Sequence, residues 1–167
     1  LSQMGGAAVR TQNNPDETGR VKGPVLDIDK GVVAAYALSG RPQRFVCTVD
    51  IIGYLDHSII IKDSDAAQEL EGLVRLKRLV ERQVRPFRLR VVTESGRRLG
   101  TAKDYLFDST SHEIAKIHVR PGLLSRVLTH EFVIGRAQVV KMTEREIIVK
   151  HEVAEKSAEA VPAESAQ

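Results

Sequence analysis

The side chains that could carry out chemistry are few and widely scattered along this chain. Its five histidines form neither a helical i, i+4 metal pair nor a histidine-rich tract. They are His57, His112, His118, His130 and His151. Cys47 is the single cysteine and lies in a predicted strand close to Val46 and Val49, so we interpret it as a small buried hydrophobe. Neither a Gly-x-Ser-x-Gly elbow nor a phosphate-binding loop is present. We therefore expect no catalytic activity, no cofactor and no metal ion.

Two pairs of carboxylates stand close together, Asp27 with Asp29 and Asp104 with Asp108. Asp27 and Asp108 each end an apolar stretch directly before a turn. A short carboxylate in that position accepts hydrogen bonds from the backbone N–H groups of the turn. We therefore assign these residues structural roles. His57 and His112 also fall in predicted turns, where we expect solvated rings.

Two groups of residues are candidates for partner binding. The first is a run of arginines spaced three, four and three residues apart, which could contact RNA phosphates or an acidic protein surface. The second is a loop with two leucines between arginines, which could dock on the first half of the chain or contact a partner. The candidate residues are Arg75, Arg78, Arg82, Arg85, Arg120, Leu123, Leu124 and Arg126. The alternative for the arginines is a solvated face balanced by Glu71 and Glu81.

The elements that must position these residues are organised by an internal duplication. Residues 100–119 align with residues 19–38 at a shift of 81 positions without a gap. Residues 132–150 align with residues 44–62 at a shift of 88, which places a seven-residue insertion near residues 120–126. Such self-similarity predicts two copies of one small domain.

Composition agrees with a folded β-rich protein. Of 167 residues, 42% are hydrophobic and only 4% aromatic, so the core must be built mostly from Val, Ile, Leu and Ala. One cysteine excludes an internal disulfide, and we expect a cytoplasmic location. No apolar run reaches the roughly 18 residues of a membrane span, so we expect no membrane insertion. The net charge is +3, and the positive charge is concentrated in residues 66–152.

Alternating apolar residues predict six short strands in each copy, joined by tight turns as in a small barrel or sandwich. Gly23-Pro24 interrupts the second strand and predicts an edge position or a bulge there. Residues 66–84 have helical periodicity instead, and Pro86 ends the predicted helix. We expect this helix to pack between the copies. The predicted divisions are a degenerate first copy (1–65), a connector helix (66–85), a second copy (86–152) and a disordered tail (153–167).

Three segments of the second copy form a recognisable pattern: the turn at residues 94–100, the segment Ala102–Asp108 and the closing strands at 132–149. Through these segments the second copy has a resemblance to the PRC-barrel family. The resemblance covers residues 86–152, and the first copy joins the family through the internal alignment. The resemblance implies two small six-stranded antiparallel PRC-type β-barrels joined by an amphipathic helix.

The expected function is a protein–protein interaction adaptor that does not catalyse a reaction. Family members suggest two alternatives: an RNA- or ribosome-associated maturation factor that uses the basic helix and second barrel, or a cytoplasmic partner of a membrane or cell-division complex. The expected partner is another protein, and RNA or a ribosome is the alternative. Assembly into a homo-oligomer is a further possibility that the sequence leaves open. Fold alone does not decide among these functions.

Overall fold

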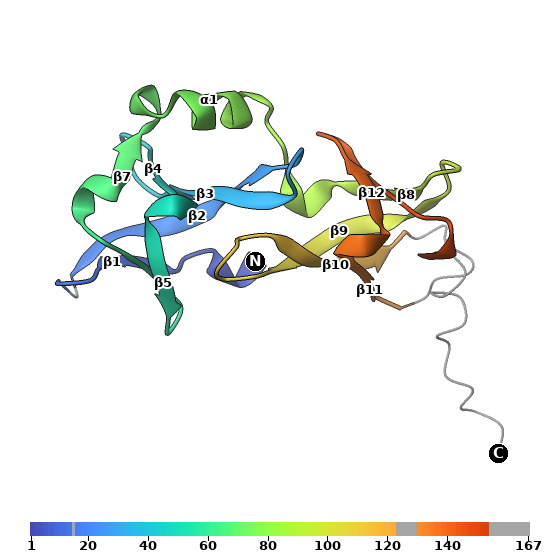
Figure 1. Ribbon diagram of the computed structural model, residues 1–167, viewed down its shortest axis with the longest axis horizontal. Helices are drawn as coiled ribbons and strands as arrows, with labels where there is room; N and C mark the ends of the chain where they lie inside the picture. Colours follow the sequence, from blue (N-terminus) through green and yellow to red (C-terminus); the bar gives the residue numbers. More distant parts are fainter. Residues whose placement is uncertain (15, 123–129, 154–167) are drawn as a thin grey trace, which may run out of the picture.

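The computed structural model describes residues 1–14, 16–122 and 130–153, and in these residues the chain is mainly β (Figure 1). The first sheet contains β1 (Ala8–Thr11), β2 (Glu17–Asp27), β3 (Val32–Leu38), β4 (Arg44–Cys47), β5 (Ile51–Leu55), β6 (Ser58–Ile61) and β7 (Ala67–Glu69). The second sheet contains β8 (Arg90–Thr93), β9 (Arg98–Phe107), β10 (Ile114–Pro121), β11 (Phe132–Gly135), β12 (Val139–Met142) and β13 (Glu146–Val149). The helical elements are α1 (Val74–Glu81) and the short 3-10 helices η1 (Ser2–Met4), η2 (Thr48–Asp50), η3 (Ser64–Ala66), η4 (Leu70–Gly72), η5 (Pro86–Arg88) and η6 (Arg136–Gln138).

The two sheets repeat one topology. The order β5-β6-β1-β2-β3-β4 in the first sheet matches the order β12-β13-β8-β9-β10-β11 in the second. The pairing register repeats as well: β2–β3 and β9–β10 shift register at equivalent places, including the bulge between Val21 and Gly23. That bulge lies at the Gly23-Pro24 interruption, as predicted. We call β1–β6 the first repeat and β8–β13 the second repeat.

The sheets differ from the expected six antiparallel strands in two respects. β7, from the connector, pairs with β4 and adds a seventh strand to the first sheet. The pairs β1–β6 and β8–β13 are parallel. The reason is the link from the fourth to the fifth strand of each repeat, where η2 or η6 bends the chain without making a hairpin. The chain therefore reverses its direction an even number of times between the first and last strands of a repeat, so these two strands are parallel.

The connector is α-helical only over Val74–Glu81, and α1 packs on the outer face of the first sheet (Figure 1). The expected helix over residues 66–84, packed between the copies, is therefore wrong in extent and position. Glycine is a poor helix residue, and Gly72 ends η4 before α1 begins. At the other end, Gln83 has a left-handed backbone (φ 51°), which ends the helix before Pro86.

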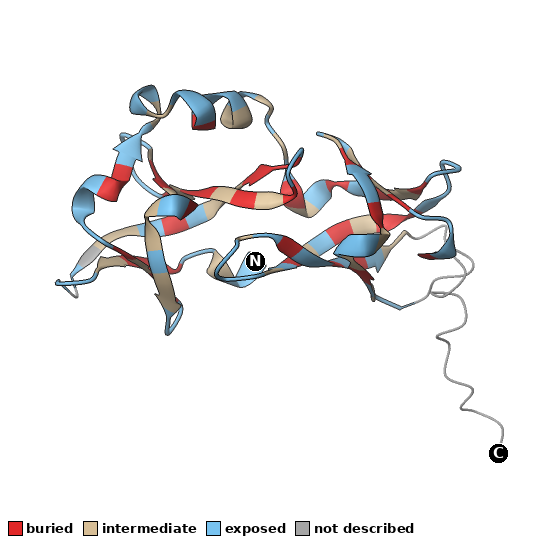
Figure 2. Ribbon diagram, in the orientation of Figure 1, coloured by how far each residue is buried: buried red, intermediate tan, exposed pale blue. Residues whose placement is uncertain are grey.

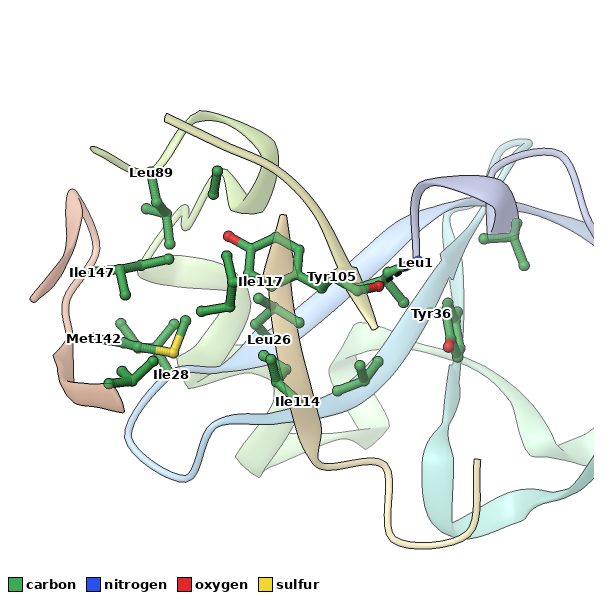
Figure 3. Packing of buried hydrophobic residues seen from close by; sticks show 14 of the residues in the cluster. Leu1, Leu26, Ile28, Tyr36, Leu89, Tyr105, Ile114, Ile117, Met142 and Ile147 are labelled. Carbon is green, nitrogen blue, oxygen red and sulfur yellow. Dashed lines mark hydrogen bonds between the residues drawn. The ribbon is translucent and has the colours of Figure 1, made fainter. Parts of the chain in front are cut away.

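One hydrophobic core runs through both repeats. Leu26 and Ile28 of the first repeat belong to the same buried cluster as Tyr105, Met142 and Ile147 of the second (Figure 3). Figure 2 shows buried segments along the inner strands of both halves, with exposed residues on the turns. The core also includes Val153, so the first residue of the predicted tail is ordered, and residues 154–167 lie outside the described residues. Each repeat thus completes its packing with the other.

Two glycines in the second repeat have different roles. Gly96 has φ 81° and lies in the turn between β8 and β9, which falls within the turn predicted at residues 94–100. Gly100 is instead required by a close approach between strands, because a Cβ atom there would lie 2.2 Å from the carbonyl oxygen of Arg120.

Candidate functional site

The outer face of the first repeat is covered by the connector. Two rows of paired residues cross it, which are Val25–Ala35–Cys47 and Gly23–Ala37–Phe45. The buried Leu76 of α1 packs against Ala35 and Phe45, which are also buried. Leu73, Leu79 and Val80 complete the apolar side of the helix. An amphipathic helix therefore covers this face.

In the described residues no strand or helix like β7 and α1 covers the equivalent face of the second repeat, although Ser2 donates hydrogen bonds to Asp104 at one side of it. At shifts of 81 and 88 positions, the two rows become Leu106–Lys116–Gly135 and Asp104–His118–Val133. Leu106 is 51% exposed and Val133 is 48% exposed, whereas their equivalents Val25 and Phe45 pack against α1. We call Leu106, Lys116, His118, Val133 and Gly135 the open face.

Two of the six differences between these rows explain why the faces differ. Ala35 and Ala37 of the first repeat correspond to Lys116 and His118, which are both exposed. Small apolar residues let a helix approach a sheet closely, whereas Lys116 and His118 keep their polar ends in water. The open face therefore has an apolar residue on either side of a polar centre.

The strand edge beside the open face is also unpartnered. In the first repeat β7 pairs with β4, through Arg44–Glu69, Phe45–Gln68 and Val46–Ala67. Its counterpart β11 pairs with β10 alone within the part of the chain that the structure describes. An edge strand presents free N–H and C=O groups that pair readily with another extended segment. The second repeat thus lacks both parts of the cover that the connector supplies to the first.

The predicted arginines do not form one surface. Arg75 and Arg78 are exposed on α1, and Arg75 lies 3.7 Å from Asp27 at the rim of a mostly apolar hollow of about 400 Å³ beneath the helix. Arg85 lies beyond the helix in the turn before Pro86. Arg82 follows the last residue of α1 and turns inward to two carboxylates.

Arg82 links three parts of the chain. Its Nε donates to Glu144 Oε1 at 2.7 Å, and its Nη1 donates to Asp29 Oδ2 at 2.5 Å. The hydrogen bond from Arg82 is the main cause that lowers the pKa of Asp29. A backbone hydrogen bond is the main cause that lowers the pKa of Glu144, and the hydrogen bond from Arg82 lowers it further. This arginine joins the β2–β3 turn, the connector and the β12–β13 turn, so its contacts are internal.

The predicted loop lies only partly within the described residues. Leu123, Leu124 and Arg126 lie outside them. Arg120 is exposed at the end of β10, and its Nε lies 3.7 Å from Glu131 Oε1. This loop connects β10 to β11 and therefore leaves and enters the sheet beside the open face.

The aspartates have the structural roles that the sequence predicts. Asp108 Oδ1 accepts hydrogen bonds from the backbone N–H groups of Ser111 at 2.8 Å and Thr110 at 2.9 Å, which lower the pKa of Asp108. Asp27 Oδ1 accepts one from the N–H of Lys30 at 3.2 Å. Cys47 is half-buried where the sequence predicted a buried residue, and it packs beside the cluster of Ala35, Phe45 and Leu76. Burial raises the pKa of its thiol, and Asp50 raises it further.

His112 differs from its prediction, because it is half-buried at the junction of the repeats. Tyr54 Oη lies 3.3 Å from His112 Nδ1 and 3.4 Å from Tyr36 Oη. Burial is the main reason that the pKa of His112 is lowered and those of both tyrosines are raised. The ring of Tyr54 also packs edge-on against Phe107. The cluster is therefore a neutral, aromatic contact between the repeats.

Within the described ranges, no group of three or more His, Cys, Asp or Glu residues could hold a metal ion. None of the described helices has both the length and the apolar character needed to cross a bilayer. No known family model matches the chain, and a comparison with curated proteins found no significant match.

Sequence reasoning did not identify the open face, although the signal was present. The internal alignment places Leu106 and Val133 opposite Val25 and Phe45, and Lys116 and His118 opposite two alanines. The alignment does not reveal that α1 covers only the residues of the first repeat.

Proposed function

We propose that this protein is a non-enzymatic adaptor that binds another protein through the open face of its second repeat. One observation supports this proposal above others: the same face is covered in the first repeat by a strand and a helix, and it is uncovered in the second. In the first repeat the elements that cover this face are segments of protein, so we expect a protein segment to bind the open face as well.

The first repeat also indicates the chemistry of the partner. β7 and α1 form an extended segment followed by an amphipathic helix, and both modes of recognition are common in protein complexes. On the second repeat an added strand would pair with β11, and apolar side chains of the helix would contact Leu106 and Val133. Because Lys116 is an exposed cation at the centre of this face, we infer that the partner segment carries an acidic residue beside its apolar ones.

We extend the proposal to the fold family. In each repeat the first and last strands are neighbours, through β1–β6 and β8–β13. This arrangement supports two sheets that each curl into a small barrel of the PRC type, in keeping with the resemblance of residues 86–152.

RNA binding, the main alternative, has weaker support. All seven aromatic residues lie within the described ranges, and each is buried or half-buried. Single-stranded RNA is usually held by stacking of its bases on exposed aromatic rings. In addition, Arg82 is engaged internally.

The proposal can be tested with a randomised peptide library displayed on phage and selected on the full chain, with counter-selection on Val133→Asp. We expect the enriched peptides to share apolar residues with neighbouring acidic residues. Their affinity should fall at least tenfold on Val133→Asp or Leu106→Asp, because a carboxylate in an apolar contact is desolvated without a partner. Val140→Asp is the matched control, since Val140 is 49% exposed on the opposite edge strand β12.

Three results would overturn the proposal. They are the absence of any enriched peptide, equal loss of affinity in Val140→Asp, and enrichment only of peptides that bind the first repeat. Peptide affinity that appears only after the chain has been cut within residues 123–129 would show instead that the chain's own loop occupies the open face.

A further inference from the structure

Several arginines outside the open face line one hollow on the other side of the connector. The hollow has a volume of about 330 Å³ and lies between the end of the connector, the start of β8 and the β12–β13 turn. Its lining residues are Gln83, Arg85, Arg88, Leu89, Arg90, Glu144 and Arg145. Four arginines from three segments therefore line one hollow.

The backbone that carries these arginines is held by the core. The buried Tyr105 donates a hydrogen bond from its hydroxyl to the carbonyl oxygen of Pro86 at 2.5 Å, and its ring packs against Phe87. The N–H of Arg88 donates to the carbonyl oxygen of Arg85 at 3.0 Å, which closes the turn around Pro86. On the opposite wall, the N–H of Arg90 donates to the carbonyl oxygen of Arg145 at 3.1 Å.

The positive charge in the hollow is only partly balanced. Glu144 is engaged by Arg82, and Arg90 pairs with Glu146 at 3.2 Å. Arg85, Arg88 and Arg145 have no carboxylate within 4.0 Å among the residues described. Like charges gathered in one hollow repel each other, and an anion placed between them would remove that repulsion.

We propose that this arginine hollow binds the phosphate group of a small, highly charged anion. Guanidinium groups form paired hydrogen bonds with phosphate oxygens, and three of them here are unengaged. The volume leaves ample room for a compact anion such as pyrophosphate. The hollow has no aromatic lining on which a nucleic-acid base could stack. This site is independent of the open face, and either proposal can fail without the other.

The test uses inorganic pyrophosphate as the probe, titrated into the full chain at low salt and followed by calorimetry and by NMR of the arginine Nε–H groups. We expect saturable binding at one site, with the resonances of Arg85, Arg88 and Arg145 shifting together. Arg88→Ala and Arg145→Ala should each raise Kd about tenfold or more. Arg145→Lys should also weaken binding, because it keeps the charge and loses the planar fork.

Arg78→Ala is the matched control, since Arg78 is exposed on α1 outside the hollow and removes the same charge. It should leave Kd within about twofold, as expected for a screened, distant charge. Equal weakening by Arg78→Ala, or no saturation, would overturn the proposal. A single-stranded RNA oligonucleotide without terminal phosphate that competes as well as pyrophosphate would overturn it in favour of nucleic-acid binding. Unchanged thermal unfolding of the arginine variants would show that any loss arises at the site.

Discussion

Gly31 and His112 occupy equivalent positions in the two repeats, and the carbonyl oxygen of each accepts a hydrogen bond from the other repeat. The N–H of Val33 donates to His112 at 2.9 Å, and the N–H of Ile114 donates to Gly31 at 2.9 Å. Val33 and Ile114 are also equivalent at the shift of 81 positions. Both acceptor residues have left-handed backbones, with φ 69° and 60°. The hairpin tips are thus related by a local twofold axis, and each repeat completes the backbone bonding of the other.

Gly100→Ala should destabilise the protein strongly. The new Cβ would lie 2.2 Å from the carbonyl oxygen of Arg120, so the β9–β10 pair must move apart. Overpacking of this kind costs about 1–3 kcal/mol, and more when backbone atoms are involved. Urea unfolding measures the change. Gly53→Ala is the control, because a Cβ there meets nothing within 4 Å, and it should change stability by less than about 0.5 kcal/mol. Equal losses in both variants would refute the close approach.

His112 should make stability depend on pH near neutrality. Burial lowers its pKa in the folded protein below the unfolded value of about 6.5. The unfolded chain therefore binds more protons in this range, and the free energy of unfolding falls as the pH drops from 7.5 to 5.5. His112→Asn should remove this part of the dependence, because asparagine tolerates a left-handed backbone and does not titrate.

The control for His112 is His57→Asn, at an exposed histidine whose backbone is also left-handed (φ 57°). It should leave the slope of stability against pH unchanged. A slope that is equally reduced in both variants would contradict a specific role for the junction between the repeats.

Arg82→Met should lower Tm by about 2 °C at neutral pH, as expected for a partly exposed ion-pair network. The lowered pKa values of Asp29 and Glu144 mean that this stabilisation is present above the usual carboxyl range and is lost as the pH falls through the folded values. Thermal unfolding at pH 7 and pH 3 should therefore show a difference between the variant and the original protein that shrinks in acid and in high salt. Arg78→Met should show no such difference at either pH.

Leu76→Ala should loosen α1 from the first repeat. Leu76 is 4% exposed and packs against Ala35 and Phe45. Truncation of a buried leucine costs about 2–5 kcal/mol, measured here by urea unfolding. Val74→Ala, at a residue that is 68% exposed on the same helix, should cost less than about 0.5 kcal/mol. If the two variants have similar stability, α1 does not cover the sheet as described.

The duplication could be predicted because repeated apolar positions have to fill equivalent places in a core. Strand positions follow from the same pattern, and the Gly23-Pro24 bulge follows from the missing N–H group of proline. β7 could not be predicted, since Ala67–Glu69 has no alternating pattern and becomes a strand only by pairing with β4. The parallel pairs depend on the path of η2 and η6, which no local preference determines.

The candidate site was harder to predict than the fold. Leu106 and Val133 alternate in the sequence like ordinary strand residues, and their exposure depends on where α1 lies. The regular spacing of Arg82 with its neighbours suggested a shared helical face, whereas its partners Asp29 and Glu144 are far away in the sequence and visible only in the folded chain. Long-range packing decides these features.

The most direct test of the docking proposal is a titration of the isotope-labelled full chain with a selected peptide, followed by backbone amide NMR. The open-face account predicts that shift changes and new amide protection centre on β11 and on Lys116 and His118. Changes confined to α1, to the first repeat or to the arginine hollow, with β11 unaffected, would contradict it.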